Sequence, residues 1–277
     1  MEEEDAGWNG TYALLGVSWV AVAALHVARG KVRDESSVAN QISIAVPLPL
    51  WWFRLVVILF LLATLALIFA DPNLHAWALT RYTVWTFVCS LAYLIESQVK
   101  YSKVQVRPVV LCFCVCAELV VGTGYWSFYG SKTYISSQTA LSQFHSTVAH
   151  MIIQVLLLVE LISLAATKEV TRLPFASTLL YLSTYMVTYA TAIFSFCHAT
   201  DSTLPYTIID PRDQGGYVPL WLLLAWFAHA VFCWVVTAAV GMRNSLADCS
   251  TLLSGKKPVE SIESFSRISV PVDFLYF

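Results

Sequence analysis

The sequence predicts an all-α fold, a polytopic membrane bundle of about seven transmembrane helices. Of its 277 residues, 58% are hydrophobic and 12% are charged, whereas roughly 25% of the residues in ordinary soluble domains are charged. The mean hydropathy is +0.67. Apolar runs long enough to cross a bilayer recur along the chain, with polar segments between them. The hydrophobic composition and the recurring apolar runs together predict an integral membrane protein.

Seven apolar runs are the expected spans. They cover residues 12–28, 49–70, 82–98, 108–129, 144–166, 176–198 and 219–241. The first run ends before Arg29, the second begins at Pro49, and the third follows Arg81 and is among the shortest. Charged residues at these edges mark where the chain leaves the apolar part of a bilayer.

The remaining runs have similar boundaries. The fourth begins at Pro108, the fifth ends before Lys168, and the seventh begins at Pro219. An acidic head, residues 1–11, precedes the first run, and a polar tail, residues 242–277, follows the last. No internal repeat or second soluble domain is recognisable, so residues 12–241 are expected to form a single transmembrane domain.

Basic residues are distributed unevenly between the two sides of the expected bundle. Of the 16 Lys and Arg residues, only Arg81, Lys132 and Arg212 fall on one side. The positive-inside rule then places the C-terminus in the cytoplasm or matrix and, with seven spans, the N-terminus outside. The acidic residues Glu2–Asp5 do not resemble a secretory signal or transit peptide. The expected location is the endoplasmic reticulum or plasma membrane, with the mitochondrial inner membrane as the alternative.

Two of the expected helices carry a stripe of polar side chains at helical spacing. In the third span the stripe comprises Thr83, Thr86, Ser90, Tyr93 and Ser97. In the sixth span it comprises Ser177, Tyr181, Thr184, Thr188, Thr191, Ser195 and His198. Because lipid disfavours such stripes, both are expected to face the inside of the bundle. There they line a cavity or, in the alternative interpretation, join neighbouring helices through hydrogen bonds.

The fifth span carries ionisable residues that are rare inside membrane helices, among them His150 and Glu160. His145 and His150 lie about 140° apart around the helix, so they do not bind one ion together. His150 is expected roughly 9 Å below the outer end of its helix, and Thr86 roughly 8 Å below the outer end of its own. A hydroxyl and an imidazole at equal depth are the minimal pair for nucleophilic catalysis.

Several short segments carry a resemblance to a known family. They are Tyr82–Phe87, Tyr125–Tyr129, His150 followed ten residues later by Glu160, and Thr200-Asp201 followed by Tyr206 and Asp210. With these segments, the stretch from Arg81 to about Trp234 resembles the androgen-induced/rolling-stone family of multi-pass membrane proteins. Some members of that family are threonine hydrolases of fatty acid esters of hydroxy fatty acids. The resemblance implies that Thr86 is the nucleophile and His150 the general base.

A hydrolase of this kind would bind a lipid ester in a pocket open to the outer leaflet, between the third and sixth helices. His198 and Tyr125 are the expected donors for oxyanion stabilisation. Gln154, Thr188 and Thr191 are the further residues expected at the pocket. This hypothesis makes the chain an enzyme of lipid metabolism.

Two groups of residues inside the spans have roles that stay open. Glu118 and Glu160 lie too deep to orient His150, so they either accept hydrogen bonds from interior hydroxyls or take part in catalysis or proton transfer. Cys112, Cys114 and Cys116 alternate along one helix and point to different sides, so they do not share a metal. We interpret them as small apolar residues.

The alternative function is a catalytically silent accessory or scaffold subunit of a larger membrane complex. Its protein partners would bind the head, Met1–Asp5, or the aromatic tail, Pro271–Phe277. Membrane lipids are expected around the helices, and no cofactor, metal or nucleic acid is expected. A haem held by His150 with His198 or His229 is a further alternative.

Overall fold

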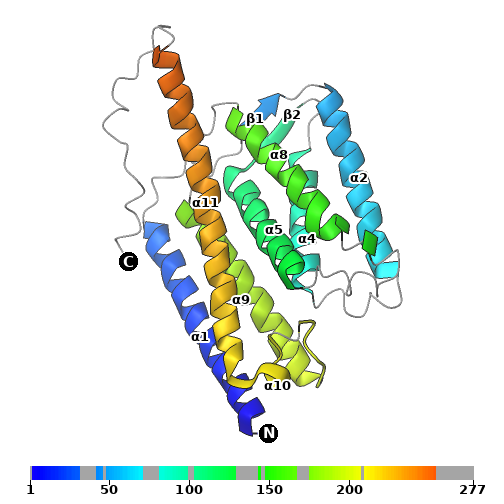
Figure 1. The fold of residues 1–277 in the computed structure, drawn as a ribbon, viewed down its shortest axis with the longest axis vertical. Helices are drawn as coiled ribbons and strands as arrows, with labels where there is room; N and C mark the ends of the chain where they lie inside the picture. Colours follow the sequence, from blue (N-terminus) through cyan, green and yellow to red (C-terminus); the bar gives the residue numbers. More distant parts are fainter. Residues whose placement is uncertain are drawn as a thin grey trace.

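The computed structural model describes residues 2–31, 42–45, 48–70, 81–98, 103–128, 143–144, 147–166, 175–206 and 209–253. Within these residues the chain forms a bundle of long helices with one small two-stranded sheet (Figure 1). The predicted helical bundle is confirmed, although its all-α description omits the sheet.

The helices overlap every expected span. They are α1 (Glu2–Lys31), α2 (Leu48–Ala70), α4 (Tyr82–Ser97), α5 (Pro108–Phe128), η2 (Val148–Ile152), α8 (Ile153–Ala166), α9 (Phe175–Ala199), α10 (Pro211–Gln214), η4 (Gly215–Tyr217) and α11 (Val218–Leu253). Residues 2–11 of the predicted acidic head belong to α1 and not to a separate segment. At the other end of the chain, α11 continues into the predicted polar tail.

Within the described residues, five helices are long and apolar enough to cross a membrane. The segments that meet this requirement are Gly7–Ala28, Trp51–Ala70, Pro108–Ser127, Phe175–Ala199 and Val218–Met242. Helix α4 has only 16 residues, and the apolar part of α8 runs from Ile153 to Ile162. A span of hydrocarbon takes roughly 20 residues. The membrane architecture therefore rests on the five long helices.

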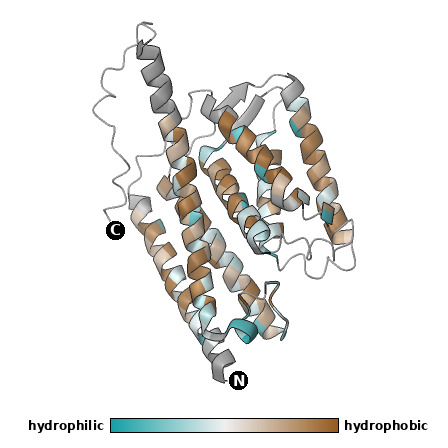
Figure 2. Cartoon of the chain, in the orientation of Figure 1, coloured by the Kyte–Doolittle hydropathy of each residue, from teal (hydrophilic) through white to brown (hydrophobic). Residues whose placement is uncertain are grey.

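The outward faces of the long helices are apolar. Phe53 and Leu59 of α2 and Phe227 and Trp234 of α11 are all exposed, and Figure 2 shows hydrophobic residues along the long helices and a hydrophilic α10. Soluble monomers rarely expose apolar patches of more than a few hundred Å². These faces are suited to lipid.

Helix α5 lies at the centre of the bundle and contacts α4, α8, α9 and α11. Cys112, Cys114 and Cys116 of α5 have no exposed surface and are free thiols. Cys112 and Cys116 are four residues apart and share a face of α5, where both interact with Cys233 of α11, whereas Cys114 points to another side. Their common burial therefore results from neighbours on more than one side of α5. This packing agrees with their interpretation as small apolar residues.

A two-stranded antiparallel sheet joins the two segments that precede α2 and α5. Its strands are β1 (Ile42–Ala45) and β2 (Lys103–Val106), with Ile42 opposite Val106 and Ala45 opposite Lys103. The sheet lies at the opposite end of the bundle from α10 (Figure 1). It therefore holds the starts of α2 and α5 close together.

Helix α9 ends in a Schellman motif. The backbone N–H of Ser202 donates to the carbonyl of Cys197 at 2.9 Å, and that of Asp201 to His198 at 3.4 Å. Asp201 has a left-handed φ of 51°, which glycine usually supplies at this position and which Asp tolerates better than most residues. The motif turns the chain sharply into the loop that leads to α10.

Candidate functional site

The polar stripe of α4 faces the interior, as predicted. Thr86 and Ser90 have no exposed surface, and Tyr93 and Ser97 are 3% and 1% exposed. Each of these four hydroxyls is bonded to a side chain from a different part of the chain. The buried face of α4 is therefore the main polar element inside the bundle.

Thr86 is fixed between a carbonyl and a phenol. Its Oγ1 donates to the backbone carbonyl of Tyr82 at 3.0 Å and lies 3.0 Å from the hydroxyl of Tyr185 on α9. Since the carbonyl takes the single hydroxyl proton of Thr86, Tyr185 is the donor in the second bond. A phenolic donor thus stands beside the predicted nucleophile, where sequence spacing gave no reason to expect one.

A second imidazole, not predicted for the site, joins this network from α11. The hydroxyl of Tyr82 lies 2.7 Å from Nε2 of His229, and Nδ1 of His229 lies 2.8 Å from the carbonyl of Ala225. A carbonyl only accepts, so in the neutral ring Nδ1 carries the proton and Nε2 accepts from Tyr82. The Tyr82 hydroxyl also interacts with that of Thr86. Thr86, Tyr82 and His229 therefore belong to one polar cluster, in which Tyr82 lies between the other two.

The predicted base, His150, lies in the π-helix η2, but its side chain is outside the described residues. The π-helix packs against α4 and α5, so the backbone at His150 lies next to the helix that carries Thr86. π-helical turns occur frequently at functional sites. The pairing of Thr86 with His150 remains a prediction.

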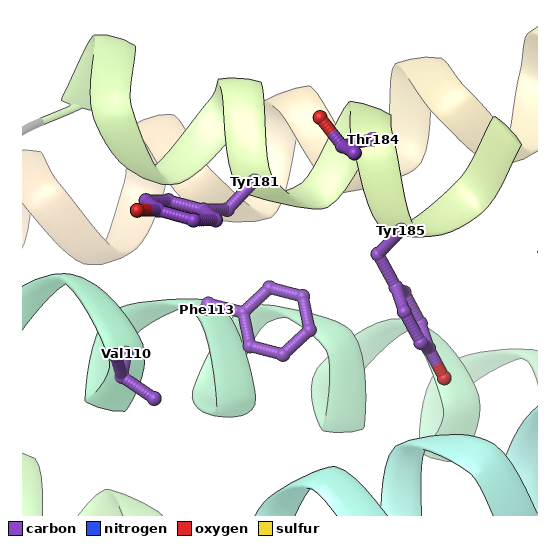
Figure 3. Close-up of a pocket in the computed structure, with 5 residues that line it drawn as sticks. All are labelled: Val110, Phe113, Tyr181, Thr184 and Tyr185. Carbon is purple, nitrogen blue, oxygen red and sulfur yellow. The ribbon is translucent and has the colours of Figure 1, made fainter. Parts of the chain in front are cut away.

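An apolar groove of about 290 Å³ runs between α5 and α9. Figure 3 shows the residues that line it, Val110, Phe113, Tyr181, Thr184 and Tyr185. Tyr185 extends from α9 past Phe113 with its hydroxyl directed away from α9 (Figure 3), and the two rings lie edge to face at 5.3 Å. The side chain that lines the groove thus also contacts Thr86.

The polar stripe of α9 does not face the interior as a whole, in contrast to the expectation. Thr188 is exposed and donates to the carbonyl of Thr184 at 2.7 Å. Thr191 accepts from the indole of Trp19 on α1 at 3.0 Å. A threonine hydroxyl that bonds to the carbonyl one turn earlier needs no interior partner. Neither predicted pocket residue lines the groove.

The other predicted site residues are dispersed. His198, an expected oxyanion donor, is exposed at the end of α9, with ring contacts to Trp8 at 4.6 Å and Tyr12 at 5.8 Å on α1. Tyr125 is at the end of α5 and lies edge to face with Trp126 at 5.1 Å. The structure places neither beside Thr86, whereas Tyr185 is in bonding contact.

Gln154 anchors α8 to α5. Its amide nitrogen donates to the backbone carbonyl of Glu118. The contact requires glycine at position 122, because a Cβ atom there would overlap the Gln154 amide. Gln154 therefore joins two helices and is not a lining residue of the groove.

Gly122→Ala is expected to reduce the free energy of unfolding by about 1–2 kcal/mol, because Gln154 must rotate away and lose its bond. Gly124→Ala is the matched control: a Cβ there meets nothing within 4 Å, so it is expected to be neutral or stabilising by up to about 1 kcal/mol. Unfolding in mixed detergent micelles measures both. Equal effects of the two substitutions would contradict the proposed packing.

The two intramembrane carboxylates both accept hydrogen bonds from α4. Ser90 donates to Glu118 at 2.9 Å, and Tyr93 donates to Glu160 at 2.9 Å. Their expected bonding to interior hydroxyls is confirmed. Glu160 also forms an ion pair of 2.6 Å with Arg54 of α2, and each of these side chains is 11% exposed. The positive-inside count treats Arg54 only as one of the basic residues of the inner side, whereas the structure places it inside the bundle.

The loop after α9 covers the N-terminal end of α4. The Tyr206 hydroxyl lies 3.4 Å from Oγ1 of Thr83, and the buried carboxylate of Asp210 accepts from the backbone N–H of Leu204 at 2.9 Å and of Arg212 at 3.0 Å. Burial raises the pKa of Tyr206 above its usual value of 10.0. Asp210 therefore fixes the loop that brings Tyr206 to α4.

Among the described residues, no cluster of three His, Cys, Asp or Glu side chains could hold a metal ion. The aromatic tail proposed as a partner site, Pro271–Phe277, and Met1 of the head lie outside the described residues.

Comparisons with protein-family models, curated proteins and solved structures find no match for the chain. The family resemblance therefore remains a prediction from the residues that carry it.

Proposed function

We propose that this chain is a membrane-embedded lipid ester hydrolase with Thr86 as its nucleophile. The observation that carries the proposal is the position of the Thr86 hydroxyl, which is buried and bonded to Tyr185. Tyr185 in turn lines the apolar groove between α5 and α9. The resemblance to the androgen-induced/rolling-stone family supports the same residue as nucleophile.

In the proposed reaction, the acyl chain of a lipid ester lies in the groove, and its carbonyl approaches Thr86 when the ring of Tyr185 turns aside. A base removes the hydroxyl proton of Thr86 as its oxygen bonds to the carbonyl carbon. Tyr185 donates to the developing oxyanion. The leaving alcohol takes the proton from the base, and water then releases the acid from the acyl-threonine.

Two imidazoles are candidates for the base. The family resemblance implies His150, whose backbone is close to α4 through η2. The described contacts offer His229, which would take the proton through the Tyr82 hydroxyl once the Thr86 hydroxyl turns from the Tyr82 carbonyl toward it. Because the His229 tautomer leaves Nε2 as an acceptor, it suits a base.

We further propose that α4 and the continuous rod of η2 and α8 complete a seven-span bundle with the N-terminus outside. Both lie beside the central helix α5. The bias of Lys and Arg supports this orientation. Membranes of the endoplasmic reticulum or cell surface are the proposed location.

The test is covalent labelling of the purified protein by a fluorophosphonate probe. Wild type is expected to be labelled at Thr86, and Thr86→Ala to lose the label completely. Thr188→Ala is the matched control, since Thr188 bonds only to the Thr184 carbonyl in the described contacts, and it is expected to label as wild type does. Labelling that survives Thr86→Ala would refute the hydrolase proposal and favour the accessory role.

The same assay separates the two bases. A base contributes typically about 10²–10⁴-fold to rate, so His150→Ala or His229→Gln is expected to slow labelling by about that factor, depending on which is used. Tyr185→Phe keeps the groove wall and removes only the donor to Thr86. It is expected to slow labelling without abolishing it.

A further inference from the structure

The polar face of α4 extends well beyond the groups that ester hydrolysis needs. At one end Thr83 lies 3.4 Å from the Tyr206 hydroxyl, and at the other Ser97 accepts from Arg54 at 2.6 Å. Between them, Thr86, Ser90 and Tyr93 each bond to another helix. The helix has 16 residues and so measures about 24 Å. Polar side chains therefore follow it from one end to the other.

Glu118 projects into the middle of this array from α5. It has no exposed surface, and one carboxyl oxygen accepts from Ser90 at 2.9 Å. The other, Oε2, has no partner among the described residues. A buried polar atom without a partner is unusual in a folded protein, and an ionisable side chain inside a membrane helix commonly marks a proton relay.

The surroundings of Glu118 disfavour a fixed carboxylate charge. The titratable side chains that interact with it are Tyr82 and Cys89 of α4, Cys114 of α5 and Tyr185 of α9. From α8, Gln154 offers a neutral amide to the Glu118 carbonyl, and from α11, His229 bonds to Tyr82. None of these described groups is a Lys or Arg that would hold the carboxylate in its charged form.

We propose that the buried face of α4 and Glu118 form a proton-transfer path between the two ends of the bundle. Oε2 of Glu118 receives a proton from one side, and the carboxyl releases a proton to an oxygen on the other side, so only O–H bonds form and break. Stripe positions one turn apart differ by about 5–6 Å in height, a gap that one water molecule bridges. The path goes beyond the proposed hydrolase, because Glu118 and Ser90 have no part in the Thr86 reaction.

The test is proton flux into liposomes that contain the purified full-length chain and a trapped pH-sensitive dye, driven by a valinomycin-clamped potassium gradient. Wild type is expected to acidify the lumen faster than protein-free liposomes. Glu118→Gln keeps the size of the side chain and its bond to Ser90 but cannot exchange a proton at Oε2. It is expected to lower the flux by about a hundredfold.

Glu96→Gln is the matched control, because Glu96 is on the same α4, 46% exposed and paired with Arg107, outside the path. It is expected to conduct as wild type does. If Glu118→Gln does not reconstitute, Ser90→Ala and Glu118→Asp provide the test, and both are expected to reduce flux. Wild-type flux no faster than that of protein-free liposomes, or unchanged flux in all Glu118 and Ser90 variants, would overturn the proposal.

Phosphonate labelling of Glu118→Gln distinguishes this proposal from the hydrolase. If Glu118→Gln is still labelled by the phosphonate but no longer conducts protons, the result supports a path that operates independently of Thr86. Loss of both in a folded Glu118→Gln would overturn the separation of the two functions. Flux that persists in a wild-type preparation that the probe does not label supports the path and refutes only the hydrolase.

Discussion

Arg54→Ala is expected to lower the free energy of unfolding by about 3–5 kcal/mol, because it leaves Glu160 buried without its cation. Arg54 makes the 2.6 Å ion pair with Glu160 and also donates to Gln98 at 2.9 Å and Ser97 at 2.6 Å. Both charged side chains are 11% exposed, so water cannot replace the lost partner. The measurement is unfolding in mixed detergent micelles, followed by circular dichroism.

Arg107→Ala is the control for this experiment. Its pair with Glu96 at 2.8 Å is about half exposed, and such pairs contribute about 0–1 kcal/mol. Replacing both Arg54 and Glu160 by leucine is expected to recover most of the lost stability, because no buried charge is then left alone. A small effect of Arg54→Ala, similar to that of Arg107→Ala, would show that Glu160 finds another partner or water.

Asp210→Ala is expected to lower the free energy of unfolding by about 2–4 kcal/mol, the second largest effect on stability. The carboxylate is 2% exposed and accepts from the backbone N–H groups of Leu204 and Arg212. It caps α10, and loss of a cap typically costs about 1 kcal/mol, to which the orphaned Leu204 N–H adds about 1–3 kcal/mol. The loop would then no longer hold Tyr206 against Thr83.

The measurement for Asp210 is again detergent unfolding, together with limited proteolysis of the loop. Asp213→Asn is the matched control, because Asp213 is an exposed acid in the same short helix, and an effect within about 0.5 kcal/mol is expected. Equal protease resistance of Asp210→Ala and wild type would argue against Asp210 as the anchor of the loop.

The two polar stripes show how far spacing alone can predict the site. Helical spacing places Thr83 to Ser97 on one face and Ser177 to His198 on another. The first stripe is buried at every position but the half-buried Thr83, whereas the second includes several exposed residues. Thr184 and Thr188 donate to carbonyls one turn earlier, and the further partner of Thr184 is the exposed His26 of α1. Their hydroxyls are therefore satisfied without partners in the interior. Spacing identifies a polar face but does not determine whether that face meets protein or lipid.

The partners of the stripe could not be predicted from the sequence. Tyr185 and His229 reach α4 from separate helices, and such contacts depend on the rotation and relative depth of packed helices. Arg54 does carry a signal, since a single cation in an apolar run needs an acid nearby, and Glu160 is such an acid in another expected span. Counting Arg54 only as a basic residue of one side of the membrane hides its pairing with Glu160.

The two-stranded sheet could likewise be predicted only in part from the sequence. Ile42-Ser43-Ile44-Ala45 and Lys103-Val104-Gln105-Val106 alternate with the period of a strand. Each run has only four residues, which is short even for a strand. Their pairing depends on two segments far apart in sequence, so no local pattern predicts it.

The pairing of β1 with β2 has a consequence for the order in which the chain is assembled. Helices α2 and α4 lie entirely between the two strands in sequence. The ladder therefore cannot form until both helices have been synthesised and β2 has emerged behind them. Contacts between such distant segments form late because loop closure must precede them. During biogenesis both helices would therefore be complete before the two strands that flank them are joined.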